Sequence, residues 1–161
     1  MNSTPAPTGE RYLFDHSSAW STTRSTALER CYDPVSRRNL AHTGIGPGRQ
    51  CLEAGGGAGP LGIWLADAVG ADGQVTVTDP ALPPDRPPHA AANLRLTDHD
   101  IANDTLPDTT FDLIHARLVL LHLPRPHRIL KKLLHALKPG GHLVPEDFDR
   151  GHVPPLHTPD A

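Results

Sequence analysis

The sequence predicts an α/β protein with an open, mostly parallel, twisted sheet of about five strands and flanking helices. Between residues 50 and 144, apolar runs of strand length are separated by helical patterns or long crossovers. The stretch "CLEAGGGAGPLG" places five glycines at the end of the first run. At 161 residues the chain has the length of one domain. Parallel strands joined by right-handed crossovers account for this order of elements.

The composition divides the chain into four segments. Residues 1–10 are dominated by Pro, Thr, Ser and Gly, and they predict a disordered tail. We expect a helical flank over residues 11–48, the core of the domain over residues 49–149, and a Pro- and His-rich tail over residues 150–161.

The flank has only a weak helical pattern. Leu28, Tyr32 and Val35 recur at helical spacing. Pro34 lacks a backbone N–H donor, and we expect it to interrupt the helix. This segment is expected to form a lid or flank of the core.

The core is expected to contain five short strands and two helices. The strands are expected over Gln50–Ala54, Gln74–Thr78, Leu94–Thr97, Phe111–His115 and His142–Val144. The helix over residues 59–69 has Pro60 in its opening turn and an apolar stripe formed by Leu61, Trp64, Leu65 and Ala68.

The second helix is expected over residues 127–138. The side chains expected to face inward are Ile129, Leu130, Leu133, Leu134 and Leu137, and those expected to form the solvated stripe are Arg128, Lys131, Lys132 and His135. Pro139 and the two glycines after it predict the end of this helix.

Composition excludes several classes of function. The net charge is −3 and the fifteen Lys and Arg residues are spread along the chain, so the basic patch of a nucleic-acid-binding protein is missing. Two cysteines without a CxxC spacing indicate a reducing compartment. The longest apolar run, residues 118–121, is too short to span a bilayer. We expect a soluble, cytoplasmic protein that binds neither nucleic acid nor membranes. The eleven histidines show no metal-ligand spacing, so no metal site is expected.

The glycine-rich turn predicts a ligand, because backbone N–H groups at a helix N-terminus attract polar or anionic groups. Residues 57–62 fit GxGxxG, which is typical of dinucleotide binding. Residues 53–59 fit an acidic-x-Gly-x-Gly-x-Gly pattern, which is typical of S-adenosylmethionine binding. Both alternatives place an adenosine ligand at the carboxyl edge of the sheet.

Two observations favour the second pattern. It begins directly where the first strand is expected to end, whereas the first pattern leaves two glycines unused. The Glu53 carboxylate suits a ligand with an ammonium group and would repel a pyrophosphate. Asp79 ends the next strand and can accept hydrogen bonds from a ribose diol in both cases.

Five segments occur in a characteristic order, namely "CLEAGGGAG", "VTVTDP", "LRLTDHDI", "LPDTTFDLIHARLVLLHL" and "ILKKLLHALKPGGHLVPEDFD". Together, from about residue 12 to residue 149, they resemble the class I S-adenosylmethionine-dependent methyltransferases. The resemblance implies a Rossmann-like sheet, S-adenosylmethionine as the cofactor, and methyl transfer to a small-molecule acceptor.

The resemblance also implies roles for the residues of the first two segments. The glycines Gly55, Gly57 and Gly59 would approach the methionine and sugar parts of the cofactor. Glu53 would lie near its amino group, and Asp79 would hold the ribose hydroxyls.

Later segments would complete the site. Asp100 and the backbone at Ile101 would meet the adenine, although Asp100 could instead cap a turn. His115 and Arg117 would lie near the sulfonium and the acceptor, with His115 as the candidate general base if the acceptor needs one. Arg117 could instead pair with Asp112 or another acid. The acids of "PEDFD" could touch the acceptor or only solubilise the sheet edge.

The family's sheet normally continues with two more strands after the fifth. Residues 150–161 are not expected to form them, so we expect a sheet that lacks the last two strands and has an exposed edge, partly blunted by Pro145. The open explanations are a shortened remnant, a second copy or partner chain at that edge, and an incomplete reading frame. Two other functions stay open, namely a non-catalytic cofactor-binding or partner-binding module and, ranked lower, an NAD(P)-dependent oxidoreductase.

Overall fold

The structure is a computed structural model, and it describes residues 19–57, 59–82, 91–149 and 151. Its centre is a five-stranded sheet in which every strand pair is parallel and the order is β3-β2-β1-β4-β5. The strands are β1 (Gln50–Ala54), β2 (Gln74–Asp79), β3 (Leu94–Asp98), β4 (Phe111–Arg117) and β5 (Leu137–Glu146). The predicted fold class is confirmed.

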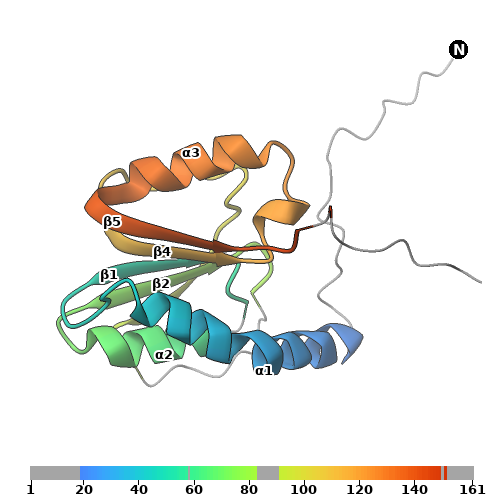
Figure 1. Cartoon of the computed structure of the whole chain (residues 1–161), viewed down its shortest axis with the longest axis horizontal. Helices are drawn as coiled ribbons and strands as arrows, with labels where there is room; N and C mark the ends of the chain where they lie inside the picture. The colour runs from blue at the N-terminus through green and yellow to red at the C-terminus, as the bar shows by residue number, and fades with distance from the viewer. Residues whose placement is uncertain (1–18, 58, 83–90, 150, 152–161) are drawn as a thin grey trace, which may run out of the picture.

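Three helices cover the sheet. They are α1 (Ala19–Ala41), α2 (Pro60–Val69) and α3 (Pro126–Ala136), and a short 3-10 turn, η1 (Leu120–His122), precedes α3. Figure 1 shows α3 on one face and α1 with α2 on the other. None of the helices in the described part of the chain has the length and apolar character needed to cross a membrane. The predicted tail over residues 1–10 lies outside the described residues, as does nearly all of the tail over residues 150–161.

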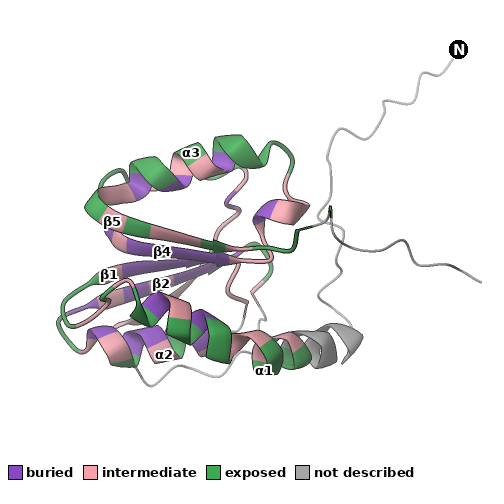
Figure 2. Ribbon diagram, in the orientation of Figure 1, coloured by how far each residue is buried: buried purple, intermediate pink, exposed green. Residues whose placement is uncertain are grey.

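The two faces of the sheet have separate apolar cores because side chains alternate along each strand. The core under α3 contains Leu52, Ala54, Ile114 and Ala116 with Ile129 and Leu133. The core under α1 and α2 contains Cys51, Val75, Val77 and Leu113 with Leu40, Leu61 and Leu65. Figure 2 shows the resulting burial of the central strands. By the same alternation, Glu53 and His115, which are register partners in β1 and β4, face α1 and α2.

Helix α1 corrects two sequence-based expectations. It runs continuously through Pro34, which we expected to interrupt it. Pro34 and Arg30 are both exposed, so water can bond the Arg30 carbonyl that the proline leaves without a donor. Val35, expected on the apolar side, is 43% exposed, whereas Ser36 is fully buried. The inward face of α1 is therefore partly polar.

The boundary between α3 and β5 also differs from the prediction. The helix ends at Ala136 and β5 begins at Leu137, so residues 137–138 are extended rather than helical. Leu134, expected to face inward, is 56% exposed. Lys132, expected in the solvated stripe, is half-buried, and its Nζ donates to the carbonyl oxygens of Ile101 at 2.7 Å and Asp104 at 2.6 Å. Relative to the inward face predicted from the sequence, the inward face of α3 is thus rotated by part of a turn.

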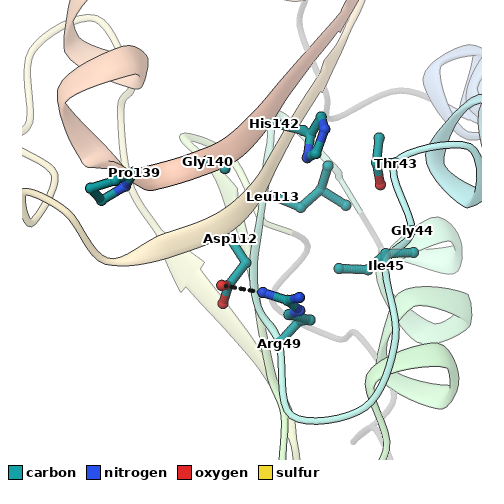
Figure 3. Close-up of a pocket in the computed structure, with 10 residues that line it drawn as sticks. Thr43, Gly44, Ile45, Arg49, Asp112, Leu113, Pro139, Gly140 and His142 are labelled. Carbon is teal, nitrogen blue, oxygen red and sulfur yellow. Dashed lines mark hydrogen bonds and ion pairs between the residues drawn. The ribbon is translucent and has the colours of Figure 1, made fainter.

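A small cavity of about 70 Å³ lies at the amino edge of the sheet, the edge opposite the glycine turn. Figure 3 shows Arg49 and Asp112 among its lining residues. Asp112 accepts hydrogen bonds from Arg49 Nη1 at 3.0 Å, from the Gln50 backbone N–H at 2.8 Å and from Lys138 Nζ at 2.7 Å. This carboxylate ties β4 to the starts of β1 and β5, so its role is structural.

Replacing Asp112 by Ala is expected to lower the free energy of unfolding by about 2 kcal/mol, because the partly buried Gln50 N–H loses a charged acceptor. Urea unfolding followed by circular dichroism measures the change. Asp72→Ala is the matched control, since Asp72 is exposed. An equal loss in both variants would contradict the assignment of Asp112 as a clamp.

Candidate functional site

The glycine turn joins β1 to α2 at the carboxyl edge of the sheet. It starts at Gly55, directly after the last residue of β1, as the acidic-x-Gly pattern predicts. The N–H groups of Gly55 and Gly56 both donate to the Thr78 carbonyl oxygen, at 2.7 and 3.1 Å. Gly55, Gly57 and Gly59 have φ angles of +70°, +56° and +82°, a region in which L side chains are strained. The backbone of β2 therefore holds the turn in a conformation that requires glycine.

Space around the turn differs from one glycine to the next. A Cβ added to Gly55 would lie 2.4 Å from Val119 Cγ2, so the segment after β4 packs against this glycine. A Cβ added to Gly57 would meet no atom of the described residues within 4 Å. Gly57 thus borders open space, as expected where a ligand approaches the backbone.

Asp79 closes the turn from the end of β2. It is 7% exposed, and its Oδ2 accepts the Gly57 N–H at 3.1 Å while its Oδ1 accepts the Ala81 N–H at 2.9 Å. Each carboxylate oxygen has a second acceptor position. The carboxylate can therefore fix the turn and still accept hydrogen bonds from a diol.

Asp100 and Ile101 lie in the turn after β3. The Asp100 carboxylate accepts the Ala102 N–H at 2.8 Å and the Asn103 Nδ2 at 2.7 Å. The Ile101 side chain is buried in the core under α3, and its carbonyl oxygen accepts Lys132 Nζ. Asp100 therefore caps its own turn, and its contact with an adenine stays a prediction.

Glu53 is buried at the end of β1. It is 4% exposed, and its Oε2 has no well-formed hydrogen bond among the described residues, although the nearby Gly62 backbone N–H favours its ionised form. Burial raises the pKa of Glu53 from 4.5 to about 8, although the nearby Arg117 guanidinium works in the opposite direction. Burial therefore favours the neutral form of this carboxyl group, which lies directly under the glycine turn.

His115 is fully buried beside Glu53. Its Nε2 lies 3.2 Å from Glu146 Oε2, and its Nδ1 lies 4.0 Å from Glu53 Oε1. The structure thus brings His115 next to Glu53, but it closes the imidazole off from solvent. Its predicted role as a general base stays untested, and its burial does not favour direct contact with an acceptor.

Helix α1 contributes residues that the motifs did not single out. Ser36 Oγ and Asn39 Nδ2 donate to the Glu146 carboxylate at 2.5 and 2.8 Å. Arg117 Nη1 donates to Ser36 Oγ and its Nη2 to Asp33 Oδ1, both at 2.9 Å. Asp33, Ser36 and Asn39 recur at helical spacing, and this polar stripe was the available signal in the sequence.

Two sequence-based alternatives are settled by this contact. Arg117 pairs with Asp33 and not with Asp112, because Asp112 lies five residues earlier in β4, about 17 Å away at the rise of a strand. Glu146, left open between the acceptor and the sheet edge, is an anchor for α1. Burial works against its charge, but hydrogen bonds from His115, Ser36 and Asn39 lower the pKa of Glu146 from 4.5 to about 2.

The raised pKa of Glu53 predicts a pH-dependent stability. Between about pH 4.5 and 8 the folded protein keeps a proton on Glu53 that the unfolded chain releases, so this group makes the free energy of unfolding fall as pH rises. Glu53→Gln is expected to remove this contribution to the slope of the free energy of unfolding against pH. Urea unfolding of both proteins in steps from about pH 5 to 8 measures it, in a range where Glu146 stays ionised. Equal slopes in both proteins would contradict the buried neutral carboxyl.

The chain is similar in sequence to known methyltransferases. A family model described as a methyltransferase domain matches residues 24–157. Methyltransferase str3 of Strobilurus tenacellus is 32% identical over 115 residues, which cover 71% of this chain and 40% of that protein. The ubiquinone/menaquinone biosynthesis C-methyltransferase UbiE of Cellvibrio japonicus is 30% identical over 123 residues, which cover 72% of this chain and 49% of that protein. The chain thus spans between 40% and about half of the length of these relatives.

Solved structures agree with this match. A SAM dependent methyltransferase from Aquifex aeolicus superimposes with a TM-score of 0.59 at 25% identity, and the match covers 74% of this chain and 68% of that one. The family match spans the glycine turn, Asp79 and the whole sheet. The chain therefore belongs to the class I S-adenosylmethionine-dependent methyltransferases.

Proposed function

We propose that the chain binds S-adenosylmethionine at the carboxyl edge of β1, β2 and β4 and transfers its methyl group to a small-molecule acceptor. The observation that carries the proposal is the glycine turn, whose Gly57 N–H is held by the buried Asp79 carboxylate. The open space at Gly57 and the unpartnered Oε2 of Glu53 fit a ligand that has both a sugar and an ammonium group.

Each part of the turn would then have one task. The glycine backbone would lie against the methionine and sugar parts of the cofactor, and Asp79 would accept the ribose hydroxyls. Glu53 would accept a hydrogen bond from the ammonium group, which favours its ionised form and so releases a proton. Asp100 and the Ile101 backbone would meet the adenine from the turn after β3.

When bound, the cofactor supplies an electrophilic methyl group on a sulfonium. The residues after β4 and the N-terminal half of α1, which extends beyond the carboxyl ends of the strands (Figure 1), would orient the acceptor toward it. Positioning of two reactants supplies a large part of the rate in such reactions. Because His115 is closed off from solvent, we assign the main contribution to positioning and not to a general base.

A second candidate function is a non-catalytic module that binds the cofactor or a partner. The observation that favours it is the edge strand β5, which pairs only with β4 among the described residues. An unpaired strand edge is a template for pairing with another chain, either a second copy or a different partner.

Binding and transfer measured together separate these candidates. Calorimetry is expected to show binding of S-adenosylmethionine and S-adenosylhomocysteine, and methyl-labelled cofactor is expected to label at least one compound in a panel of small amines, phenols and carbon acids. Binding without transfer to any of them would favour the non-catalytic module. A folded sample that binds neither compound would contradict the methyltransferase function and a cofactor-binding module, and would favour a module that binds only a partner.

Gly57→Val is expected to weaken S-adenosylhomocysteine binding about tenfold or more, because the new side chain would occupy the open space beside the turn. Gly44→Val is the matched control. Gly44 also has a positive φ, +71°, and open space around it, so both variants pay a similar backbone strain, but Gly44 lies at the opposite edge of the sheet. Equal affinity of the two variants would show that the open space at Gly57 is not a ligand site.

A further inference from the structure

The imidazole of His115 lies between two carboxyl groups on neighbouring strands. Glu53 is its register partner in β1, and Glu146 stands at the end of β5. His115 Nε2 is 3.2 Å from Glu146 Oε2, and Nδ1 is 4.0 Å from Glu53 Oε1. The imidazole is fully buried, so both contacts are shielded from water. Glu53, His115 and Glu146 thus form a row of side chains that crosses the sheet from β1 to β5.

Two polar atoms within this row of side chains lack well-formed hydrogen bonds among the described residues, namely His115 Nδ1 and Glu53 Oε2. A buried polar atom without a partner costs about 1–3 kcal/mol. Such a cost in a folded protein calls for an explanation, and functional sites are one place where it is tolerated. The unsatisfied atoms both lie at the Glu53 end of this row of side chains.

That end touches the glycine turn. A Cβ added to Gly56 would lie 2.7 Å from Glu53 Cδ, and one added to Gly62 would lie 3.1 Å from Glu53 Oε2. The Glu53 carboxyl therefore packs against the backbone of the turn and of the first turn of α2. A change in the orientation of the Glu53 carboxyl group therefore acts directly on the backbone of the glycine turn.

The other end holds α1. Glu146 accepts hydrogen bonds from Ser36 and Asn39, and Arg117 binds Ser36 and Asp33 beside it. These contacts fix α1 to the carboxyl ends of β4 and β5. The charged groups that face His115 and Glu53 are Glu146 from β5, Arg117 from β4, and Asp33 and Glu29 from α1.

We propose that His115 is a positioning residue that couples the orientation of the Glu53 carboxyl under the glycine turn to the docking of α1 through Glu146. With its proton on Nε2, the imidazole donates to Glu146 and leaves Nδ1 as an acceptor facing Glu53. A carboxyl group that turns toward Nδ1 to donate to it moves away from a cofactor ammonium, and one that turns toward the ammonium releases Nδ1. Cofactor binding and α1 docking thereby influence the same imidazole. The part of this inference that concerns Glu53 rests on the proposed cofactor site.

Two substitutions separate the two contacts of His115. The amide of Gln reaches about as far as Nε2, so His115→Gln keeps a donor for Glu146 and loses the group facing Glu53. The amide of Asn reaches about as far as Nδ1, so His115→Asn keeps a group facing Glu53 and loses the donor to Glu146. The readouts are S-adenosylhomocysteine affinity by calorimetry and hydrogen exchange of the amides of α1.

His115→Gln is expected to weaken S-adenosylhomocysteine binding about tenfold while α1 keeps its protection. His115→Asn is expected to raise the exchange rate of residues 36–41 about tenfold with a smaller change in affinity. In the wild type, S-adenosylhomocysteine is expected to slow exchange in α1, and this slowing should vanish in both variants. The proposal would be overturned if both variants lost cofactor affinity and α1 protection to the same extent while S-adenosylhomocysteine still slowed exchange in α1.

Glu146→Gln tests the same coupling without changing the imidazole. It keeps the size of the side chain but weakens the bonds to Ser36 and Asn39, so it is expected to expose α1 to exchange and to weaken cofactor binding. Val35→Ala, on the exposed side of the same helix, is the control and should change neither. If the wild type fails to bind S-adenosylhomocysteine, the proposed function is contradicted, and the exchange of α1 in the two His115 variants still decides whether His115 holds α1.

Discussion

The parallel pairing of β1 with β2 and β4 is the constraint on which the rest of the structure depends. Parallel strands bring all their carboxyl ends to one edge, so the glycine turn after β1, Asp79 at the end of β2 and Arg117 at the end of β4 come to the same edge. The turn is then fixed by bonds from Gly55 and Gly56 to the Thr78 carbonyl. The proposed cofactor site lies at this edge, where ligands bind in other open α/β sheets.

The two faces of the sheet are stabilised in different ways. Under α3 the contacts are almost entirely apolar, and Lys132 closes the end of that layer by binding backbone carbonyls. Under α1 the apolar core ends near Leu40 and Leu113, and a polar group centred on Glu146 takes over toward the carboxyl edge. Charged hydrogen bonds of this kind are directional, and leaving one partner unpaired is costly. They therefore specify where α1 sits more sharply than apolar packing alone would.

Two carboxyl groups near this edge, the buried Glu53 and the partly buried Glu146, have pKa values shifted in opposite directions. Glu146 receives three hydrogen bonds and stays ionised, with a pKa of about 2. Glu53 has an unpartnered oxygen and, with a pKa of about 8, stays neutral. Desolvation disfavours charge at both positions, but Glu53 is more deeply buried and Glu146 has more hydrogen-bond donors. His115 donates to Glu146 and makes no hydrogen bond with Glu53, so the unused hydrogen-bonding capacity lies at the side of the proposed cofactor site.

The sequence by itself determined the strands, the order of the segments, the glycine turn and the acidic residue after β2, because each depends on local patterns of apolar residues, glycine and chain order. It did not determine the path of α1 through Pro34, the rotation of α3 that exposes Leu134, or the partner of Arg117. The partner of Arg117 depends on which surfaces meet, because Asp33 lies 84 residues earlier in the chain. Only the tertiary structure decided that His115, predicted at the acceptor side, is sealed between Glu53 and Glu146, because strand register and not sequence distance sets its neighbours.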